Sequence, residues 1–350
     1  RASLGVQDTN PEVQKAVNRI QPPQRNKEAV SWLRESGINN INIDLMYGLP
    51  LQTIKTFEKT IEDALELEPA RIALFGYAHV PWVKPAQKVL EKCGIPTSEE
   101  KADLFILGKR SFEKAGYEFI GLDHFAKPAD ALIKARKNGT LHRNFQGYST
   151  CAGIDLFAVG LTSISETRTS YRQNFKTMED YKNAVESGEL PIERGIVLDG
   201  EDLLRRAVIM DIMCALKVDF NNYGVDFRSK FAEALAKMED MQKDGLVQMR
   251  EGGFSVLPIG RLFLRNIAML FDGRLAAHDH HAVAHLQHQI GRGQQRHAAA
   301  VDTAYIDAVA VAQAQRPEAF AVYFGTGDDD TARDELAVDG VPVDILAVPV

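Results

Sequence analysis

The chain has 350 residues, of which 45% are hydrophobic and 25% charged, as in an ordinary globular protein. After Leu275 there are 4 basic and 11 acidic residues, which accounts for the whole net charge of -7. Residues 1–275 are therefore neutral, and their net charge gives no electrostatic case for nucleic-acid binding. No apolar run reaches the ~18 residues of a membrane span. The three distant cysteines exclude a disulfide framework and a self-contained metal site, and fit a cytoplasmic protein.

Residues 1–80 alternate between strand and helix patterns. The expected elements are a strand over Arg1–Gln7, helices after Pro11 and over Asn26–Gly37, a strand over Ile38–Tyr47, a helix over Thr53–Leu67 and a strand over Arg71–His79. In the second strand Ile and Leu alternate with Asn, Asp and Met, which predicts an apolar and a polar face. The βαβαβ order predicts parallel strands with crossover helices, as in an α/β barrel or an open sheet.

The next part of the chain mixes helices and strands. We expect a helix over Ser98–Ala115, strands over Tyr117–Ala126 and Asp155–Ser165, and a long helix over Asp199–Leu216. Helix, hairpin and helix patterns then follow over residues 226–244, 245–257 and 259–271, which is typical of a small winged-helix-like module.

Residues 276–350 have a different composition. They contain no Lys, Ser, Asn, Met, Cys or Trp, yet hold six of the nine His. We expect a frame-shifted or disordered segment or an unrelated extension, with no part in function. Its histidines include an i, i+4 pair, but without a carboxylate pattern we do not expect a metal site at His278, His280, His281, His285 and His288.

Candidate functional residues lie at strand ends, where parallel α/β barrels place their sites. Gln7 ends the first strand, Asp44 lies near the end of the second, and residues 77–79 end the third. Asp44 within an apolar strand needs a partner or water, because a lone buried charge is costly. From the pattern alone, a structural salt bridge or cap at Asp44 is equally compatible, and a turn-capping amide at Gln7 is favoured.

Residues Tyr117–Thr150 concentrate polar groups beside aromatic ones. Together with other stretches they resemble the oxygen-independent coproporphyrinogen III oxidases, a radical S-adenosylmethionine family of haem biosynthesis. The similar stretches are LGVQD (4–8), VNR (17–19), NIDLMYGLPLQT (42–53), FGYAHVP (75–81), FIGLDHFAKP (119–128), LHRNFQGYST (141–150) and GRLFLRNIAMLFD (260–272). The HRNFQGY stretch distinguishes this family from the haem-chaperone-like relatives.

The resemblance implies a fold, cofactors and a reaction. The fold is α/β, the C-terminal half of a partial (β/α)₆ barrel followed by a mostly helical, winged-helix-like domain. The family uses S-adenosylmethionine and a [4Fe-4S] cluster to decarboxylate two propionates of coproporphyrinogen III oxidatively to vinyls, giving protoporphyrinogen IX. Residues matching the S-adenosylmethionine positions are Gln7, Arg19, Asp44, Ala78 and Ile164. Without the resemblance, Arg19 reads as a solvated helix-end charge and Ile164 as core.

The stretch over residues 119–150 is expected to face the propionates of the tetrapyrrole. The candidate substrate residues are His124, Lys127, His142, Arg143, Asn144, Gln146 and Tyr148. The alternative interpretation is a polar network that packs the C-terminal domain against the barrel. No metal ligand is expected in this chain.

The chain departs from the family pattern in lacking a CxxxCxxC motif. We therefore expect an N-terminally truncated enzyme with domains at 1–115 (the last three barrel strands), 116–275 and 276–350. This chain alone should not cleave S-adenosylmethionine, and 5′-deoxyadenosine formation after reconstitution with iron and sulfide would contradict that. We expect an electron donor protein as partner, no nucleic acid or membrane, and a monomeric full-length form.

Two other functions remain open from the sequence. One is a haem-binding, chaperone-like relative without oxidase activity, in which His124, His142 and Tyr148 could ligate iron and haem addition would shift the Soret band. The other is a nucleic-acid-binding module formed by the winged-helix-like region 199–272, which salt-dependent DNA binding would support.

Overall fold

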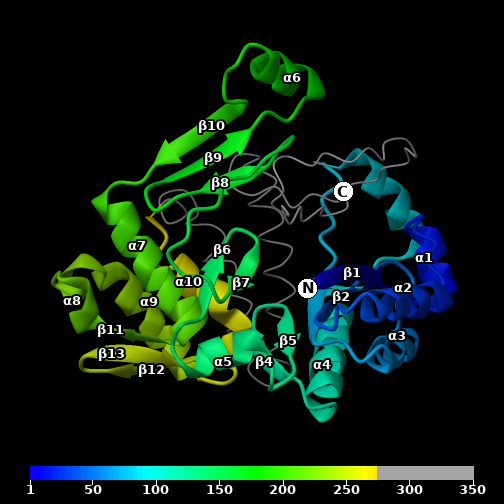
Figure 1. Ribbon diagram of the computed structural model, residues 1–350. Helices are drawn as coiled ribbons and strands as arrows, with labels where there is room; N and C mark the ends of the chain where they lie inside the picture. Colours follow the sequence, from blue (N-terminus) through cyan, green and yellow to red (C-terminus); the bar gives the residue numbers. More distant parts are fainter. Residues whose placement is uncertain (83, 274–350) are drawn as a thin grey trace.

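The computed structural model describes residues 1–82 and 84–273 (Figure 1). The expected segment 276–350, with its histidines, lies outside the described residues.

Five strands form the first sheet, in the order β1-β2-β3-β5-β4. Their bounds are β1 Ala2–Gln7, β2 Ile41–Tyr47, β3 Arg71–Gly76, β4 Glu118–Gly121 and β5 His124–Ala126. The strands β1, β2 and β3 pair in parallel, as predicted, whereas β5 pairs antiparallel with β3 and with β4. The sheet is therefore mixed, with its parallel part confined to the first three strands.

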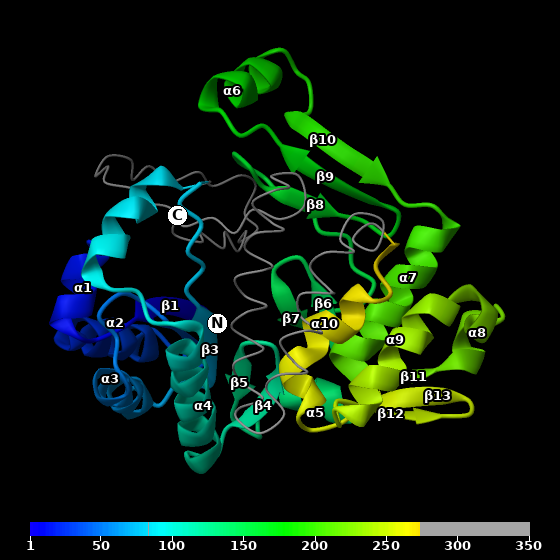
Figure 2. The same cartoon turned by 180° about the vertical axis from the view of Figure 1, so that it is seen from behind.

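The crossover helices lie together on one side of this sheet (Figures 1 and 2). Their bounds are α1 Pro11–Ala16, α2 Pro23–Glu35, α3 Ile54–Glu66, the 3₁₀ helix η1 Pro85–Cys93 and α4 Ser98–Lys114. Both α3 and α4 begin with a capping box, in which Thr53 and Thr97 accept the backbone N–H three residues later. These caps explain why the predicted helix starts are close to the observed ones.

The predicted two-faced character of the second strand is wrong. All residues of β2 are buried except Asp44, which is half-buried. A parallel strand with a neighbour on each side is usually covered on both faces, so Asn42 and Met46 are buried together with Ile43 and Leu45.

The single strand expected over Tyr117–Ala126 is also wrong, because the segment is a tight hairpin. β4 ends at Gly121 and β5 begins at His124, with Leu122 in the left-handed region at φ 53° in the turn. The first sheet thus extends past the expected domain boundary at residue 115. One face of the hairpin, with Phe119 and Phe125, packs in the core of the first sheet, while Ile120 belongs to a second core.

A short hairpin and a separate antiparallel sheet follow. After α5 Ala131–Lys137, the hairpin consists of β6 His142–Asn144 and β7 Gly147–Ser149. The sheet has the order β10-β9-β8, with β8 Ile164–Glu166, β9 Ser170–Asn174 and β10 Ile192–Val197, and the helix α6 Met178–Glu186 connects β9 to β10. The strand expected over Asp155–Ser165 is wrong: before β8, only an isolated bridge from Leu156 to Glu166 forms. The apolar side chains of Ile154, Phe157 and Val159 are instead exposed, at 68%, 68% and 88%.

The C-terminal part contains the predicted long helix and the helix–hairpin–helix. Its elements are α7 Gly200–Met210, the π-helical turn η2 Asp211–Ala215, β11 Lys217–Asp219, the 3₁₀ turn η3 Phe220–Tyr223, α8 Phe227–Lys230, α9 Ala232–Lys243, β12 Val247–Arg250, β13 Gly253–Val256, the 3₁₀ turn η4 Gly260–Phe263 and α10 Leu264–Met269. β13 lies between β11 and β12. In both views the β6–β7 hairpin lies between the first sheet and the helices α7 to α10 (Figures 1 and 2).

Candidate active site

Three of the predicted cofactor residues meet around Gly5 on β1. The guanidinium Nη2 of Arg19 donates to the Gly5 carbonyl oxygen at 2.8 Å. Gly5 pairs in register with Asp44 on β2. A Cβ on Gly5 would lie 2.7 Å from Gln7 Nε2 and 3.1 Å from Arg19 Nη2, so a larger residue here would displace the Gln7 amide from its present position. The chain therefore forms a polar cradle from β1, β2 and the loop after α1.

Asp44 is held inside this cradle by neutral donors. Its carboxylate accepts from Asn42 Nδ2 at 2.6 Å and from Ser3 Oγ at 3.4 Å. Burial raises its pKa, and these hydrogen bonds, together with the positive charges of Arg1 and Arg19, oppose that rise only in part. A carboxylate of this kind is suited to accept from a hydroxyl group or to balance a cation.

Gln7 carries two marks of a ligand-facing residue. Its backbone is in the left-handed region at φ 63°, which is uncommon for a residue other than glycine. Its side-chain oxygen Oε1 is buried and has no hydrogen-bond partner within the described residues. Buried polar atoms are nearly always paired, so this oxygen is a candidate acceptor for a bound molecule.

Ala78 lies just beyond the carboxyl end of β3. The neighbouring Tyr77 N–H donates to the Tyr47 carbonyl oxygen at 2.8 Å. The Gln87 side chain accepts from Val80 N–H at 2.6 Å and donates to the Ala78 carbonyl oxygen at 3.2 Å. The backbone at Ala78 is therefore fixed at the same end of the sheet as Gln7.

Ile164 is not brought to this cradle by any described contact. It lies on β8, in the separate antiparallel sheet, where it pairs with Gln173.

A second cluster forms where the β4–β5 turn meets the β6–β7 hairpin. The His124 ring contacts the Tyr148 ring edge-on at a centroid distance of 5.7 Å. The Arg143 guanidinium lies 5.3 Å from the Tyr148 ring centroid. The Tyr148 hydroxyl donates to the Met213 carbonyl oxygen in η2 at 3.1 Å. The sequence-predicted residues His124, Arg143 and Tyr148 thus form one group.

The electrostatics of this group follow from its burial. Burial lowers the pKa of His124 to about 4, with the positive charges of Arg143, Arg71 and Arg265 acting in the same direction and Asp123 opposing them. Burial likewise raises the pKa of the nearby Cys214 thiol to about 12. At neutral pH the imidazole is therefore uncharged and the thiol protonated, which leaves Arg143 as the cation of the group.

The other candidate substrate residues lie apart from this group or have local partners. Lys127 lies over the Tyr117 ring, with its Nζ 5.9 Å from the centroid. The Asn144 side chain accepts from the Gln146 N–H at 3.0 Å, and the Gln146 side chain is exposed. His142 pairs with Ser149 across the hairpin and is half-buried.

Two parts of this chain match known protein families. Residues 1–64 match the family described as the radical SAM superfamily, and residues 198–263 match the HemN C-terminal domain. An oxygen-independent coproporphyrinogen III oxidase from Thermostichus vulcanus is 42% identical over 280 residues, which cover 79% of this chain and 86% of that protein. The chain belongs to the oxygen-independent coproporphyrinogen III oxidase family.

Other members of this family are longer than the chain. The oxygen-independent coproporphyrinogen III oxidase from Synechocystis is 42% identical over 280 residues, which cover 78% of this chain but 60% of that protein. A solved structure titled "Coproporphyrinogen III oxidase (HemN) from Escherichia coli is a Radical SAM enzyme" superposes with a TM-score of 0.76 at 40% identity, over 78% of this chain and 64% of that one. The chain thus spans about three fifths of the length of these two relatives, and the predicted family and fold class are confirmed.

Sequence reasoning missed two ion pairs beside the second cluster of this oxidase-family chain. Arg71 Nε and Asp130 Oδ2 are 2.8 Å apart and buried, and Arg265 Nη2 lies 3.2 Å from Asp123 Oδ2. The sequence offered one sign of the first pair: Arg71 begins an apolar strand, and a buried charge there needs an oppositely charged partner. The partners come from distant loops and helices, which no local pattern identifies.

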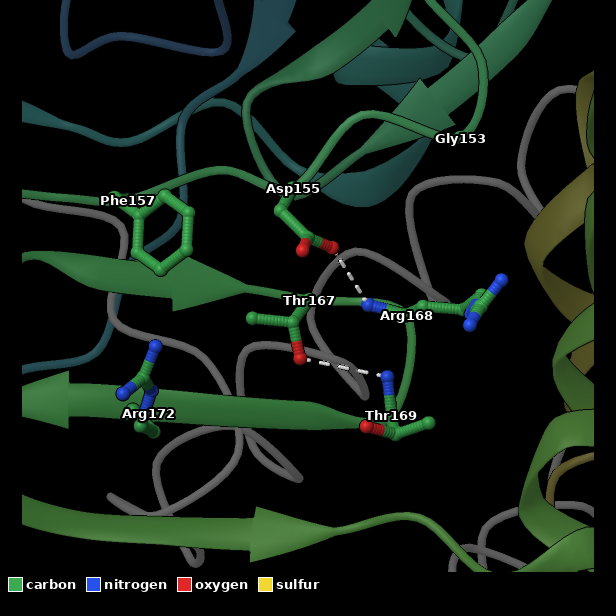
Figure 3. A pocket seen from close by; sticks show the side chains of 7 residues that line it. All are labelled: Gly153, Asp155, Phe157, Thr167, Arg168, Thr169 and Arg172. Atoms are coloured by element: carbon green, nitrogen blue, oxygen red, sulfur yellow. Dashed lines mark hydrogen bonds between the residues drawn. The ribbon is translucent and has the colours of Figure 1, made fainter.

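A hollow away from both clusters was also not predicted. It has a volume of about 460 Å³ and lies between the loop 153–157 and the β8–β9 turn (Figure 3). Asp155 accepts from the Arg168 N–H at 2.9 Å, and the Arg172 guanidinium lies 5.8 Å from the Phe157 ring centroid. None of the predicted site residues lines this hollow.

Among residues 1–82 and 84–273, no three His, Cys, Asp or Glu side chains are grouped so that they could hold a metal ion. Within the same residues, no helix is long and apolar enough to cross a membrane.

Proposed function

We propose that this chain is the part of an oxygen-independent coproporphyrinogen III oxidase that binds S-adenosylmethionine and the tetrapyrrole. The enzyme would convert two propionates of coproporphyrinogen III to vinyl groups. The observation that carries this proposal is the meeting of Gln7, Arg19 and Asp44 around Gly5, in a chain whose relatives bear this enzyme's name. Asp44 reaches the cradle through the β1–β2 register, and Arg19 through its hydrogen bond to the Gly5 carbonyl oxygen.

The cradle has free groups that suit S-adenosylmethionine. Arg19 uses one of its five donors on Gly5, and the others can pair with the methionine carboxylate. Asp44 can accept from a ribose hydroxyl or balance the sulfonium, and the unpartnered Gln7 oxygen can accept from an amine or hydroxyl. The fixed backbone at Ala78 would add to these contacts, whereas Ile164, on β8 in the separate sheet, has no described contact with the cradle. When bound, S-adenosylmethionine supplies the radical that removes hydrogen from the substrate.

The [4Fe-4S] cluster does not fit the described residues. Cys93, Cys151 and Cys214 are free and come from separate parts of the fold, and no group of metal-binding side chains lies there. We therefore propose that the cluster ligands come from polypeptide outside the described residues. An electron donor protein, a monomeric full-length form and a cytoplasmic location belong to the same proposal, and the free cysteines support a reducing compartment.

Binding of S-adenosylmethionine to the 350-residue chain tests the proposal by isothermal titration calorimetry. Arg19→Gln should weaken binding by about 10- to 100-fold, because hydrogen bonds to a charged group contribute about 1.5–3 kcal/mol. The matched control is Lys15→Gln, which removes an exposed cation from the neighbouring helix α1 and should leave the affinity unchanged. The cradle assignment fails if the chain does not bind S-adenosylmethionine or if both variants bind it equally.

A further inference from the structure

The charges around the β4–β5 turn do not balance. Arg71 is paired with Asp130, whose side chain is 1% exposed, and Arg265 is paired with Asp123. Arg143, the third guanidinium near His124, has no carboxylate within salt-bridge distance in the part of the chain that the structure describes. The group thus carries one unmatched positive charge.

Arg143 is nevertheless held in place and partly buried. Its Nη1 atom is inaccessible to solvent and has no hydrogen-bond partner among the described residues. Its guanidinium lies over the face of the Tyr148 ring, which attracts a cation without satisfying its N–H donors. Leaving a charged donor unpaired and out of water is costly, so this atom points to an anionic partner supplied by a ligand.

His124 faces the same space. Its ring lies against Tyr148 and Phe75 in edge-on contacts, and its Nδ1 is buried without a partner. A Cβ on Gly147 would lie 3.9 Å from His124 Nε2 and 4.0 Å from Arg143 Nη1. The other ring nitrogen of His124, Nε2, and Arg143 Nη1 therefore lie near one small volume beside Gly147, with ordinary van der Waals room for a methyl-sized group.

Tyr148 is fixed from both sides. Its hydroxyl donates to Met213 in the π-helical turn, and a Cβ on Gly121 would lie 2.6 Å from that hydroxyl oxygen. The ring that supports both His124 and Arg143 is therefore anchored to the C-terminal core rather than free to rotate.

We infer that Arg143 and His124 form a carboxylate-binding subsite beside Gly147, with Tyr148 as a positioning residue. The subsite rests on the proposed function and takes one propionate of the tetrapyrrole. Arg143 supplies the positive charge and a donor, the neutral imidazole supplies a second donor from its protonated nitrogen, and the planar guanidinium suits a carboxylate. The remaining propionates bind elsewhere.

The test uses coproporphyrin III, the stable oxidised form of the substrate, and its uncharged tetramethyl ester. Binding to the 350-residue chain is followed by the Soret absorbance. Wild-type chain should bind the acid at least about 10-fold more tightly than the ester. Arg143→Gln should weaken binding of the acid by about 10- to 100-fold and leave the ester unaffected. Arg143→Lys should restore part of the loss, and exposed Arg110→Gln on α4 should have no effect.

The outcomes separate the two proposals. If wild-type chain binds neither porphyrin, coproporphyrinogen is not the substrate and the proposed function fails. If it binds acid and ester equally, or if Arg143→Gln binds the acid as wild type does, only the carboxylate subsite is overturned. Unchanged affinity for S-adenosylmethionine shows that the Arg143→Gln variant is folded. The comparison of acid with ester in the wild-type chain tests the subsite without any variant.

The positioning role of Tyr148 has its own measurement. Tyr148→Phe keeps the ring but loses the hydrogen bond to Met213. It should reduce the ratio of acid to ester affinity about 3- to 10-fold, equal to the loss of one hydrogen bond. A merely structural role would lower both affinities together and leave the ratio unchanged, which would refute this assignment.

Discussion

Replacing His124 by Gln should change how the stability of the chain depends on pH. In the folded chain burial lowers the pKa of His124 to about 4, whereas an unfolded histidine titrates near 6.5. As pH falls, the unfolded state therefore takes up the proton first. The stability that the folded state gains from keeping His124 uncharged is fully present above about pH 6.5 and is lost as pH falls towards 4.

The size of this effect follows from the difference between the two pKa values. A difference of about 2.5 pKa units corresponds to about 3 kcal/mol, with a slope of about 1.4 kcal/mol per pH unit between the two values. Urea unfolding of wild type and His124→Gln from pH 4.5 to 7.5 measures it. The free energy of unfolding of wild type, minus that of the variant, should rise with pH from 4.5 to about 6.5 and then level off.

Parallel pH curves for wild type and His124→Gln would refute this reasoning, because they would show that His124 binds a proton equally in both states. His142→Gln is the matched control. It removes an imidazole from the neighbouring β6 strand, and the His124 slope must persist in it.

Two further substitutions test the packing around the site. Asp130→Ala should lower the free energy of unfolding by about 3–5 kcal/mol in urea titrations, because it leaves the buried Arg71 unpaired and removes the N-cap of α5. A loss of less than about 1 kcal/mol, as for an exposed pair, would contradict a buried ion pair. Gly260→Ala should cost about 1–3 kcal/mol or more, because its Cβ would lie 1.9 Å from the Leu246 carbonyl oxygen. Gly200→Ala is its control, because a Cβ there would have nothing within 4 Å, and it should be neutral or slightly stabilising in the same urea titrations.

The sequence predicted those parts of the fold that depend on local signals. The helix over Ser98–Lys114 follows from a capping box at Thr97 and a regular apolar face, and β2 from its run of Ile and Leu. The turn at Leu122 was missed because a left-handed leucine has no local signature. The strand expected over Asp155–Ser165 was wrong because apolar composition alone does not supply a partner strand.

The candidate site was predictable in its residue types but not in its grouping. The resemblance pointed to Gln7, Arg19 and Asp44, yet their meeting depends on the register between β1 and β2. Likewise, nothing in the sequence shows that Arg143 lacks a carboxylate while Arg71 has one, because both partners are set by tertiary packing.

The π-helical turn η2, which follows α7, is connected to the cluster of His124, Arg143 and Tyr148 by the hydrogen bond from the Tyr148 hydroxyl to the Met213 carbonyl oxygen. An α-helix rotates by about 100° per residue, and a π-turn accommodates one extra residue within it. Deleting a single residue from 211–215 would replace the π turn by a regular α turn and leave the chain after Ala215, including β11, close to its present direction relative to α7. It would also displace the carbonyl that receives the Tyr148 hydroxyl, 65 residues away in sequence. A change of one residue in η2 would therefore act on the hydrogen bond from Tyr148, and through it on the hairpin that carries Arg143.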